Sequence, residues 1–71
     1  MRTKYYVRIT NTMADFGFDD QKEAFDFARE CKATNMNELV TLNRRVWADN
    51  GRIVEYNTVA IKPDGTFEIL Y

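Results

Sequence analysis

The stretch LVTLNRRVWADNGRIVEYNTVAIKPDGTFEILY, residues 39–71, decides the fold because two turn signals divide it into three short strands. The pair Asn50-Gly51 is the preferred centre of a two-residue type I′ hairpin. The triplet Pro63-Asp64-Gly65 suits a three-residue loop with glycine in the left-handed region. We therefore predict a strand from about Leu39 to Ala48 and two further strands, each joined to the preceding one by a tight turn.

The two turns also predict which side chains share a face of the sheet. If the first turn places Asp49 opposite Arg52, then Leu42 lies opposite Val59. The second turn, considered independently, continues the same face, and such agreement is expected of a correct register. The predicted inner face carries the apolar residues Val40, Leu42, Val59, Ile61, Phe67 and Ile69.

The opposite face of these strands has an unusual composition for a surface. The same register pairs Trp47 with Val54 and Arg45 with Tyr56. A slip of one residue, through a bulged first turn, would instead pair Arg45 with Glu55 and move every side chain of one strand to the other face. We predict the unslipped register because it keeps the inner face apolar.

The N-terminal third of the chain predicts one more strand. Residues from Lys4 to Thr10 alternate between two faces, and Tyr6, Arg8 and Thr10 fall on the outer one. The apolar residues between 11 and 18 predict a loop that folds over an edge of the core. These residues include Met13, Phe16 and Phe18 around Gly17.

A single helix is predicted between the first two strands. Asp20 suits the N-cap, and Glu23 three positions later can complete a capping box. The helix should run to about Thr34, where Asn35 can adopt the left-handed conformation that ends a helix. Its buried stripe, by the i, i+3, i+4, i+7 spacing, should hold Ala24, Phe27, Ala28 and Cys31.

These elements predict one α+β domain over residues 1–71, of order β-α-β-β-β. One helix can cover one side of a four-stranded antiparallel or mixed sheet, so the other side stays open. The first strand can lie beside either the second or the fourth, because both connections are allowed. The open side would carry Trp47 and Tyr56, which we expect to be exposed to solvent.

The composition disfavours several classes of function. The chain has no histidine, which excludes imidazole ligands and nucleophiles activated by histidine. Cys31 falls on the buried helical stripe, where a structural thiol is expected. Asp19, Asp20 and Glu23 could hold a cation, but their spacing fits no calcium loop and helix capping explains them. We therefore expect no enzyme, no metal and no cofactor.

The charge balance and the single cysteine indicate the cellular compartment in which we expect the chain. The 10 Lys and Arg residues against 11 Asp and Glu give a net charge of −1. One cysteine cannot form an internal disulfide, which favours a reducing compartment such as the cytoplasm. No stretch approaches the roughly 20 apolar residues of a membrane span.

Aromatic and arginine side chains on an open sheet favour recognition of another macromolecule. Tyrosine, tryptophan and arginine are enriched at interface hot spots, and the slightly acidic net charge favours a protein partner over single-stranded nucleic acid. The alternatives are nucleic-acid binding, homodimer formation and plain cross-strand pairs that stabilise a hairpin. The predicted binding residues are Tyr6, Arg8, Arg45, Trp47, Val54 and Tyr56, and a second, acidic epitope comprises Asp19, Asp20, Glu23, Asp26 and Glu30.

The format of the chain adds one resemblance. In its 71 residues, its lack of catalytic residues and its predicted β-α-β-β-β order, it resembles small stand-alone inhibitors of bacterial viruses and other mobile elements, including anti-CRISPR proteins. That resemblance implies a stoichiometric inhibitor in the host cytoplasm, which acts by covering a surface of a host protein complex.

Overall fold

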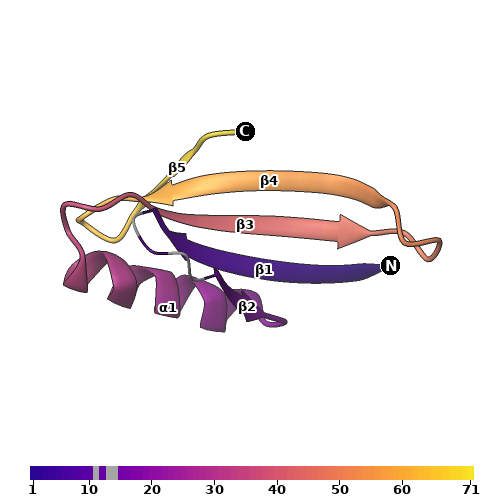
Figure 1. Ribbon diagram of the computed structural model, residues 1–71, viewed down its shortest axis with the longest axis horizontal. Coiled ribbons are helices and arrows are strands. Elements are labelled where there is room, and N and C mark those ends of the chain that lie inside the picture. The colour runs from indigo at the N-terminus through magenta and orange to yellow at the C-terminus, as the bar shows by residue number, and fades with distance from the viewer. Residues whose placement is uncertain (11, 13–14) are drawn as a thin grey trace.

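The computed structural model describes residues 1–10, 12 and 15–71, which form one helix and a five-stranded antiparallel sheet (Figure 1). The class is α+β, as predicted, but the sheet has five strands and not four. The elements are β1 (Arg2–Ile9), β2 (Asp15–Phe18), α1 (Gln21–Thr34), β3 (Val40–Trp47), β4 (Ile53–Ile61) and β5 (Phe67–Ile69).

The strand order β2-β1-β3-β4-β5 settles the position of the first strand, which pairs with β3. Every pairing is antiparallel, so the sheet is not mixed. Helix α1 lies against one side of the sheet, on β1, β2 and β3, and extends as far as β4 (Figure 1). One face of the sheet is therefore covered by the helix and the other is open.

The fifth strand is β2, which occupies part of the segment predicted as a loop. Asp15–Phe18 pairs with β1, with Phe18 opposite Tyr5 and Phe16 opposite Val7. Both phenylalanine rings pack against Phe27 of α1, at centroid distances of 4.9 and 5.1 Å. The alternation of Phe16 and Phe18 around Gly17 was a strand signal, and the loop prediction was wrong here. Met13 lies outside the described residues.

The start of α1 confirms the predicted N-cap. The Asp20 carboxylate accepts a hydrogen bond from the Glu23 backbone N–H at 3.1 Å. At the other end the helix stops at Thr34 as predicted, but Asn35 does not adopt the left-handed conformation, since its φ is −124°. Its backbone N–H and its side-chain amide both donate to the Cys31 carbonyl at 2.9 Å, so the helix end is capped without a left-handed residue.

The core lies between α1 and the covered face of the sheet. Val7, Val40, Ala24 and Ala28 are fully buried. The predicted stripe faces the core, but Phe27 and Cys31 are only half-buried against it, and Lys32 is buried as well. The Lys32 ammonium group donates to the carbonyls of Met36 and Glu38, at 3.1 and 2.6 Å, so it caps the helix end while its methylene chain packs.

The β3–β4 pairing follows the predicted register except at its tip. Leu42 lies opposite Val59, and Arg45 opposite Tyr56. The turn, however, holds three residues, because Ala48 bonds to Arg52 and Gly51 takes a φ of 86°. The bulged turn slips the register by one residue, and a shift between Val46 and Trp47 restores it. Trp47 therefore lies opposite Ile53 and not opposite Val54, which corrects that prediction.

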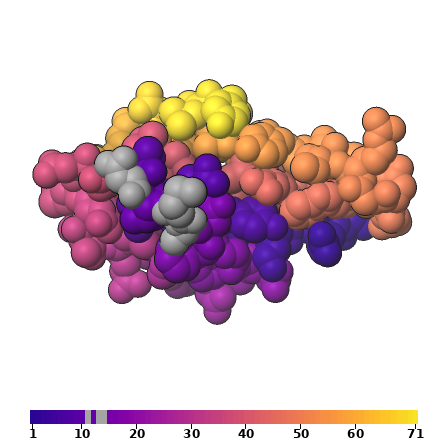
Figure 2. Space-filling view, in the orientation of Figure 1, coloured from indigo at the N-terminus to yellow at the C-terminus, as the bar shows by residue number. Residues whose placement is uncertain are grey.

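The sheet is much longer than the helix that covers it. The 14 residues of α1 span about 21 Å, whereas the molecule is 39 Å long. The β3–β4 turn and the start of β1 project beyond the helix as a narrow arm (Figure 2). Within the described residues no helix is long and apolar enough to span a bilayer.

Candidate functional site

The open face of the sheet carries a cluster of one arginine and three tyrosines, Tyr6, Arg45, Tyr56 and Tyr71, which we call the arginine–tyrosine cluster. The Arg45 guanidinium carbon lies 4.5 Å from the centre of the Tyr6 ring and 5.6 Å from that of Tyr56. Both distances are within the range of cation–π attraction. Strand pairing explains the arrangement, because Arg45 lies directly opposite Tyr56 and Tyr6 lies opposite the neighbouring Asn43.

Asn43 fixes the orientation of Arg45 from below. Its side-chain oxygen accepts a hydrogen bond from Arg45 Nε at 2.6 Å. Its side-chain nitrogen donates to the Thr58 hydroxyl and to the Asn57 carbonyl, both at 3.0 Å. Asn43 and Thr58 are buried although they lie on the open face. Because every polar atom of this buried amide is bonded, the guanidinium group is held in place rather than free to rotate.

Tyr71 joins the cluster through a break in the β4–β5 pairing. Simple alternation would place Tyr71 with Phe67 and Ile69 on the covered face. Instead, the N–H groups of Leu70 and Tyr71 both donate to the Thr58 carbonyl, at 2.9 and 3.3 Å, as in a β-bulge. The Tyr71 ring stacks on Tyr56 with an interplanar angle of 2° and a centroid distance of 6.1 Å.

Arg8 lies beside the cluster and is already paired. Its Nε and Nη2 atoms donate to the two carboxylate oxygens of Asp15 at 2.7 and 2.9 Å. This two-pronged bond lowers the pKa of Asp15, and the positive charges of Arg8 and Arg45 add to the effect. It also raises the pKa of Arg8. Arg45, by contrast, has no carboxylate within ion-pair distance among the residues that the structure describes.

These side chains surround a small hollow in the middle of the open face, which we call the central hollow. Its volume is about 100 Å³. Most of its lining is polar, and the floor is formed by the buried Asn43 and Thr58. The full lining comprises Tyr6, Arg8, Asp15, Thr41, Asn43, Arg45, Tyr56, Thr58 and Tyr71.

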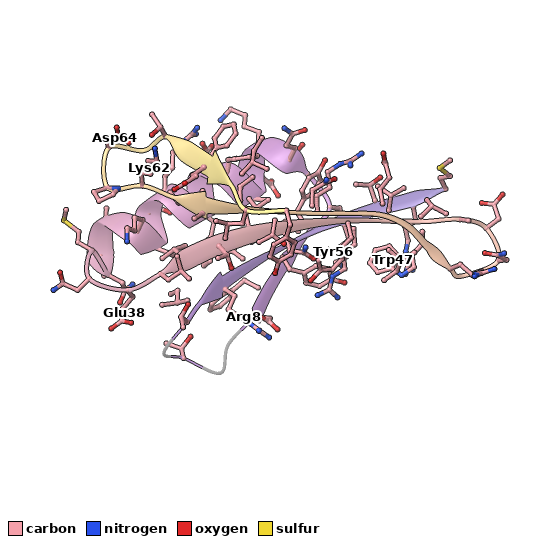
Figure 3. The ribbon with its side chains drawn as sticks, turned by 90° about the horizontal axis from the view of Figure 1, so that it is seen from above. Arg8, Glu38, Trp47, Tyr56, Lys62 and Asp64 are labelled. Atoms are coloured by element: carbon pink, nitrogen blue, oxygen red, sulfur yellow. The ribbon has the colours of Figure 1, made fainter. Side chains whose placement is uncertain are left out.

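Trp47 lies on the same face but nearer the projecting end of the sheet. Figure 3 shows Arg8, Tyr56 and Trp47 spaced along the sheet. The Arg2 guanidinium carbon lies 4.8 Å from the centre of the indole ring, and both residues border a shallow hollow of about 400 Å³ at the β3–β4 turn. Tyr56 is 46% exposed, and Trp47 is half-buried under Arg2. The structure therefore divides the predicted binding residues into a central group and an outer one.

The acidic epitope is partly neutralised by neighbouring cations. Asp26 pairs with Lys22 at 2.7 Å and with Arg29 at 3.7 Å, and its pKa is lowered chiefly by the hydrogen bond from Lys22. Asp20 is the helix N-cap, and Asp19 lies 3.7 Å from Lys4. Glu23 and Glu30 remain exposed. No three acidic, cysteine or histidine side chains of the described residues come together as metal ligands would.

A third hollow, which the sequence did not suggest, lies on the covered side between α1 and β5. The Phe25 ring of α1 contacts Phe67 of β5 at a centroid distance of 5.4 Å. Beside it is an apolar hollow of about 200 Å³ bordered also by Leu42 and Val59. Ile69 and Phe67 face the same side and are 74% and 47% exposed. The β5 edge therefore presents apolar surface that the helix does not bury.

Cys31 has the properties of a structural thiol. Partial burial raises its pKa, and the nearby charge of Glu30 adds to the rise, so the thiolate is disfavoured.

Comparison with protein-family models, curated proteins and solved structures finds no match to this chain. Any proposal about function must therefore come from the geometry of the open face itself.

Proposed function

We propose that this chain is a non-enzymatic protein-binding module whose open sheet face docks onto another protein. The proposal rests on the arrangement of Arg45. This residue is hydrogen-bonded to Asn43 and lies between the Tyr6 and Tyr56 rings. It has no carboxylate partner among the described residues. An arginine whose orientation is already fixed loses little side-chain entropy on binding. Arginine and tyrosine are also the residues on which interface hot spots are built.

The distribution of charge on this face supports a protein partner over nucleic acid. A groove for single-stranded nucleic acid uses a row of cations that follows the phosphates, together with free aromatic rings that stack with bases. Here Arg8 is already paired with Asp15, and Lys4 lies 3.7 Å from Asp19. Arg45 and Arg2 lie over the rings of Tyr6 and Trp47, which leaves less ring surface for bases.

The proposed mode of action is stoichiometric occlusion of a partner in the cytoplasm, as for the small inhibitors of mobile elements that the chain resembles in format. A surface formed by short polar and aromatic side chains on a rigid sheet can cover a site on another protein without a conformational change of its own. The absence of histidine and the disfavoured thiolate of Cys31 support a role without catalysis.

The test is affinity capture from the native host with matched variants. Combined Trp47→Ala and Tyr56→Ala substitution should abolish retention of the specific partner, because it removes rings from both groups of the open face. The control is the double variant Glu23→Gln and Glu30→Gln, which alters the acidic helix face and should retain the partner. Equal retention by the Trp47 and Tyr56 variant would refute the open face as the docking surface.

A binding experiment with nucleic acid distinguishes a protein-binding module from the main alternative, a module that binds single-stranded nucleic acid. Labelled oligonucleotide should show negligible binding even in low salt if the partner is a protein. Retention in low salt that falls steeply as salt rises would identify a nucleic-acid module instead.

A second candidate function is self-association, and the exposed edge strand β5 favours it. Ile69, Phe67 and Leu70 are 74%, 47% and 44% exposed, and an exposed apolar edge strand readily pairs with another strand. A homodimer would also help so small a core. Light scattering decides the point, since a monomer has a mass of 8.4 kDa and a dimer about twice that.

A further inference from the structure

We infer that the central hollow binds one carboxylate group, supplied by an aspartate or glutamate side chain of the protein partner. The inference rests on the proposed docking function of the open face and names the chemistry at its centre. The two arginines of the hollow differ, since Arg8 already holds a carboxylate and Arg45 does not.

The hydrogen-bonding groups of Arg45 leave one side of the guanidinium group available. Nε is bonded to Asn43 at 2.6 Å, and no hydrogen bond from Nη1 or Nη2 is found within the described part of the chain. These two nitrogens form a planar fork that matches the two oxygens of a carboxylate. Arg8 next to the site also holds a carboxylate by two hydrogen bonds, although it does so side-on, through Nε and Nη2 to Asp15 at 2.7 and 2.9 Å.

The charges of the hollow leave room for one negative group. Arg8 and Asp15 neutralise each other, so Arg45 carries the one unpaired charge among the described side chains that line the hollow. One carboxylate neutralises that charge. A phosphate monoester carries about −1.5 to −2 at neutral pH and would leave an excess beside Asp15. A chain of phosphodiesters would need further unpaired cations along the strand direction, where Lys4 is already near Asp19.

The size and walls of the hollow suit a single small group. Its volume of about 100 Å³ has room for a few water molecules or one small polar group. The stacked rings of Tyr56 and Tyr71 form one wall and can exclude water from a carboxylate once the partner covers the face. Exclusion of water strengthens the interaction between the two charges. A partner with an acidic side chain at the centre of its docking surface therefore fits this face.

The inference can be tested on the purified chain without knowledge of the partner. Acetate, inorganic phosphate and dimethyl phosphate are titrated separately at constant ionic strength while the Arg45 Nε–H and Asn43 side-chain amide signals are followed by NMR. Acetate should shift these signals saturably. Arg45→Gln should weaken acetate binding at least tenfold, whereas Arg44→Gln, which removes the same charge from the opposite face of β3, should change it less than twofold.

Unfolding of the Arg45→Gln variant would also weaken acetate binding, so a second variant is needed to test the role of the guanidinium group. Arg45→Lys keeps the charge but removes the planar fork, and it should bind acetate several-fold more weakly than the unaltered chain. A saturable response to acetate that is equally strong in this variant would overturn the two-pronged geometry. No saturable shift with acetate, or either phosphate binding tenfold more tightly than acetate, would overturn the carboxylate assignment.

These outcomes are separate from those that test the proposed function. If acetate does not bind but partner capture is still lost with the Trp47 and Tyr56 variant, the inference fails and the docking function stands. If acetate binding depends on Arg45 but capture does not depend on Trp47 and Tyr56, the docking function fails and the hollow remains an anion site.

Discussion

The two faces of β3 bury side chains by different means. On the covered face, Val40 and Leu42 are buried by contact with apolar neighbours of the core cluster. On the open face, Asn43 is buried beside them in the strand, yet its neighbours are Arg45, the Thr58 hydroxyl and a backbone carbonyl. Burial of apolar area supplies most of the stability, whereas a satisfied polar network mainly fixes orientation. The covered face therefore supplies most of the stability, and the open face fixes the orientation of one arginine.

The largest effect is expected from the same substitution at a buried and at an exposed leucine. Leu42→Ala should lower the free energy of unfolding by about 2–5 kcal/mol, because Leu42 is 3% exposed and its loss leaves a cavity in the core. Leu70→Ala, at a residue 44% exposed, should lower it by about 1 kcal/mol or less. Urea unfolding followed by circular dichroism measures both, and equal losses would contradict the assignment of the core to the covered side.

A smaller effect is expected from the polar network. Asn43→Ala should lower the free energy of unfolding by about 1–3 kcal/mol, because it leaves the buried Thr58 hydroxyl without its donor and frees Arg45. Asn57→Ala is the control, since the Asn57 side chain is exposed and bonds to Arg44 at 3.2 Å. The same unfolding experiment measures both variants. A loss no greater in Asn43→Ala than in the control would show that the network contributes nothing to stability.

The smallest effect concerns the Arg8–Asp15 pair at the side of the open face. The pKa of Asp15 is lowered in the folded chain, first by the hydrogen bond from Arg8. Its contribution to stability is therefore present above the ordinary aspartate pKa and is lost as the pH falls and the carboxyl group gains a proton. Asp15→Asn should flatten part of the decline in urea midpoint between about pH 5 and pH 3.

In Asp15→Asn, the decline in urea midpoint that remains at acid pH comes from other carboxylates whose pKa is lowered in the folded chain. Asp26 and Asp64 are held below the usual range by Lys22 and by Thr66 respectively. Asp26→Asn is thus the matched comparison, and it should also flatten the slope, through the loss of the Lys22 pair and without changing Arg8. An unchanged slope in Asp15→Asn would show that the exposed pair has no net effect on stability.

The turns and the alternation of residues were enough to predict most of the fold. Leu42 lies opposite Val59 and Arg45 opposite Tyr56 as predicted, although the predicted two-residue turn at Asn50-Gly51 was wrong and the shift at Trp47 compensates for its extra residue. The Asp20 cap and the end of α1 at Thr34 were also predicted. All of these depend on residues close together in the chain, where the period of a strand and the chemistry of a turn act directly.

The sequence could not predict features that depend on contacts between distant strands. The compensating shift that leaves Val54 unpaired with Trp47, and the bulge that brings Tyr71 to Tyr56, both reverse what alternation implies. Such irregularities arise where two strands of unequal length must pair, and neither strand records them alone. The strand formed by Asp15–Phe18 was missed because four residues give too short an alternation to distinguish a strand from a loop.

The alternation of residues thus predicted which face of β1, of β3 and of most of β4 a side chain occupies, including Arg45 and Tyr56 on the open face of the sheet. The burial of Asn43 on that face, its hydrogen bond to Arg45 and the exposure of most of β5 became evident only from the three-dimensional structure. The physical reason is that alternation is a local property of the extended backbone, whereas burial and hydrogen-bond partners depend on which segments meet in space.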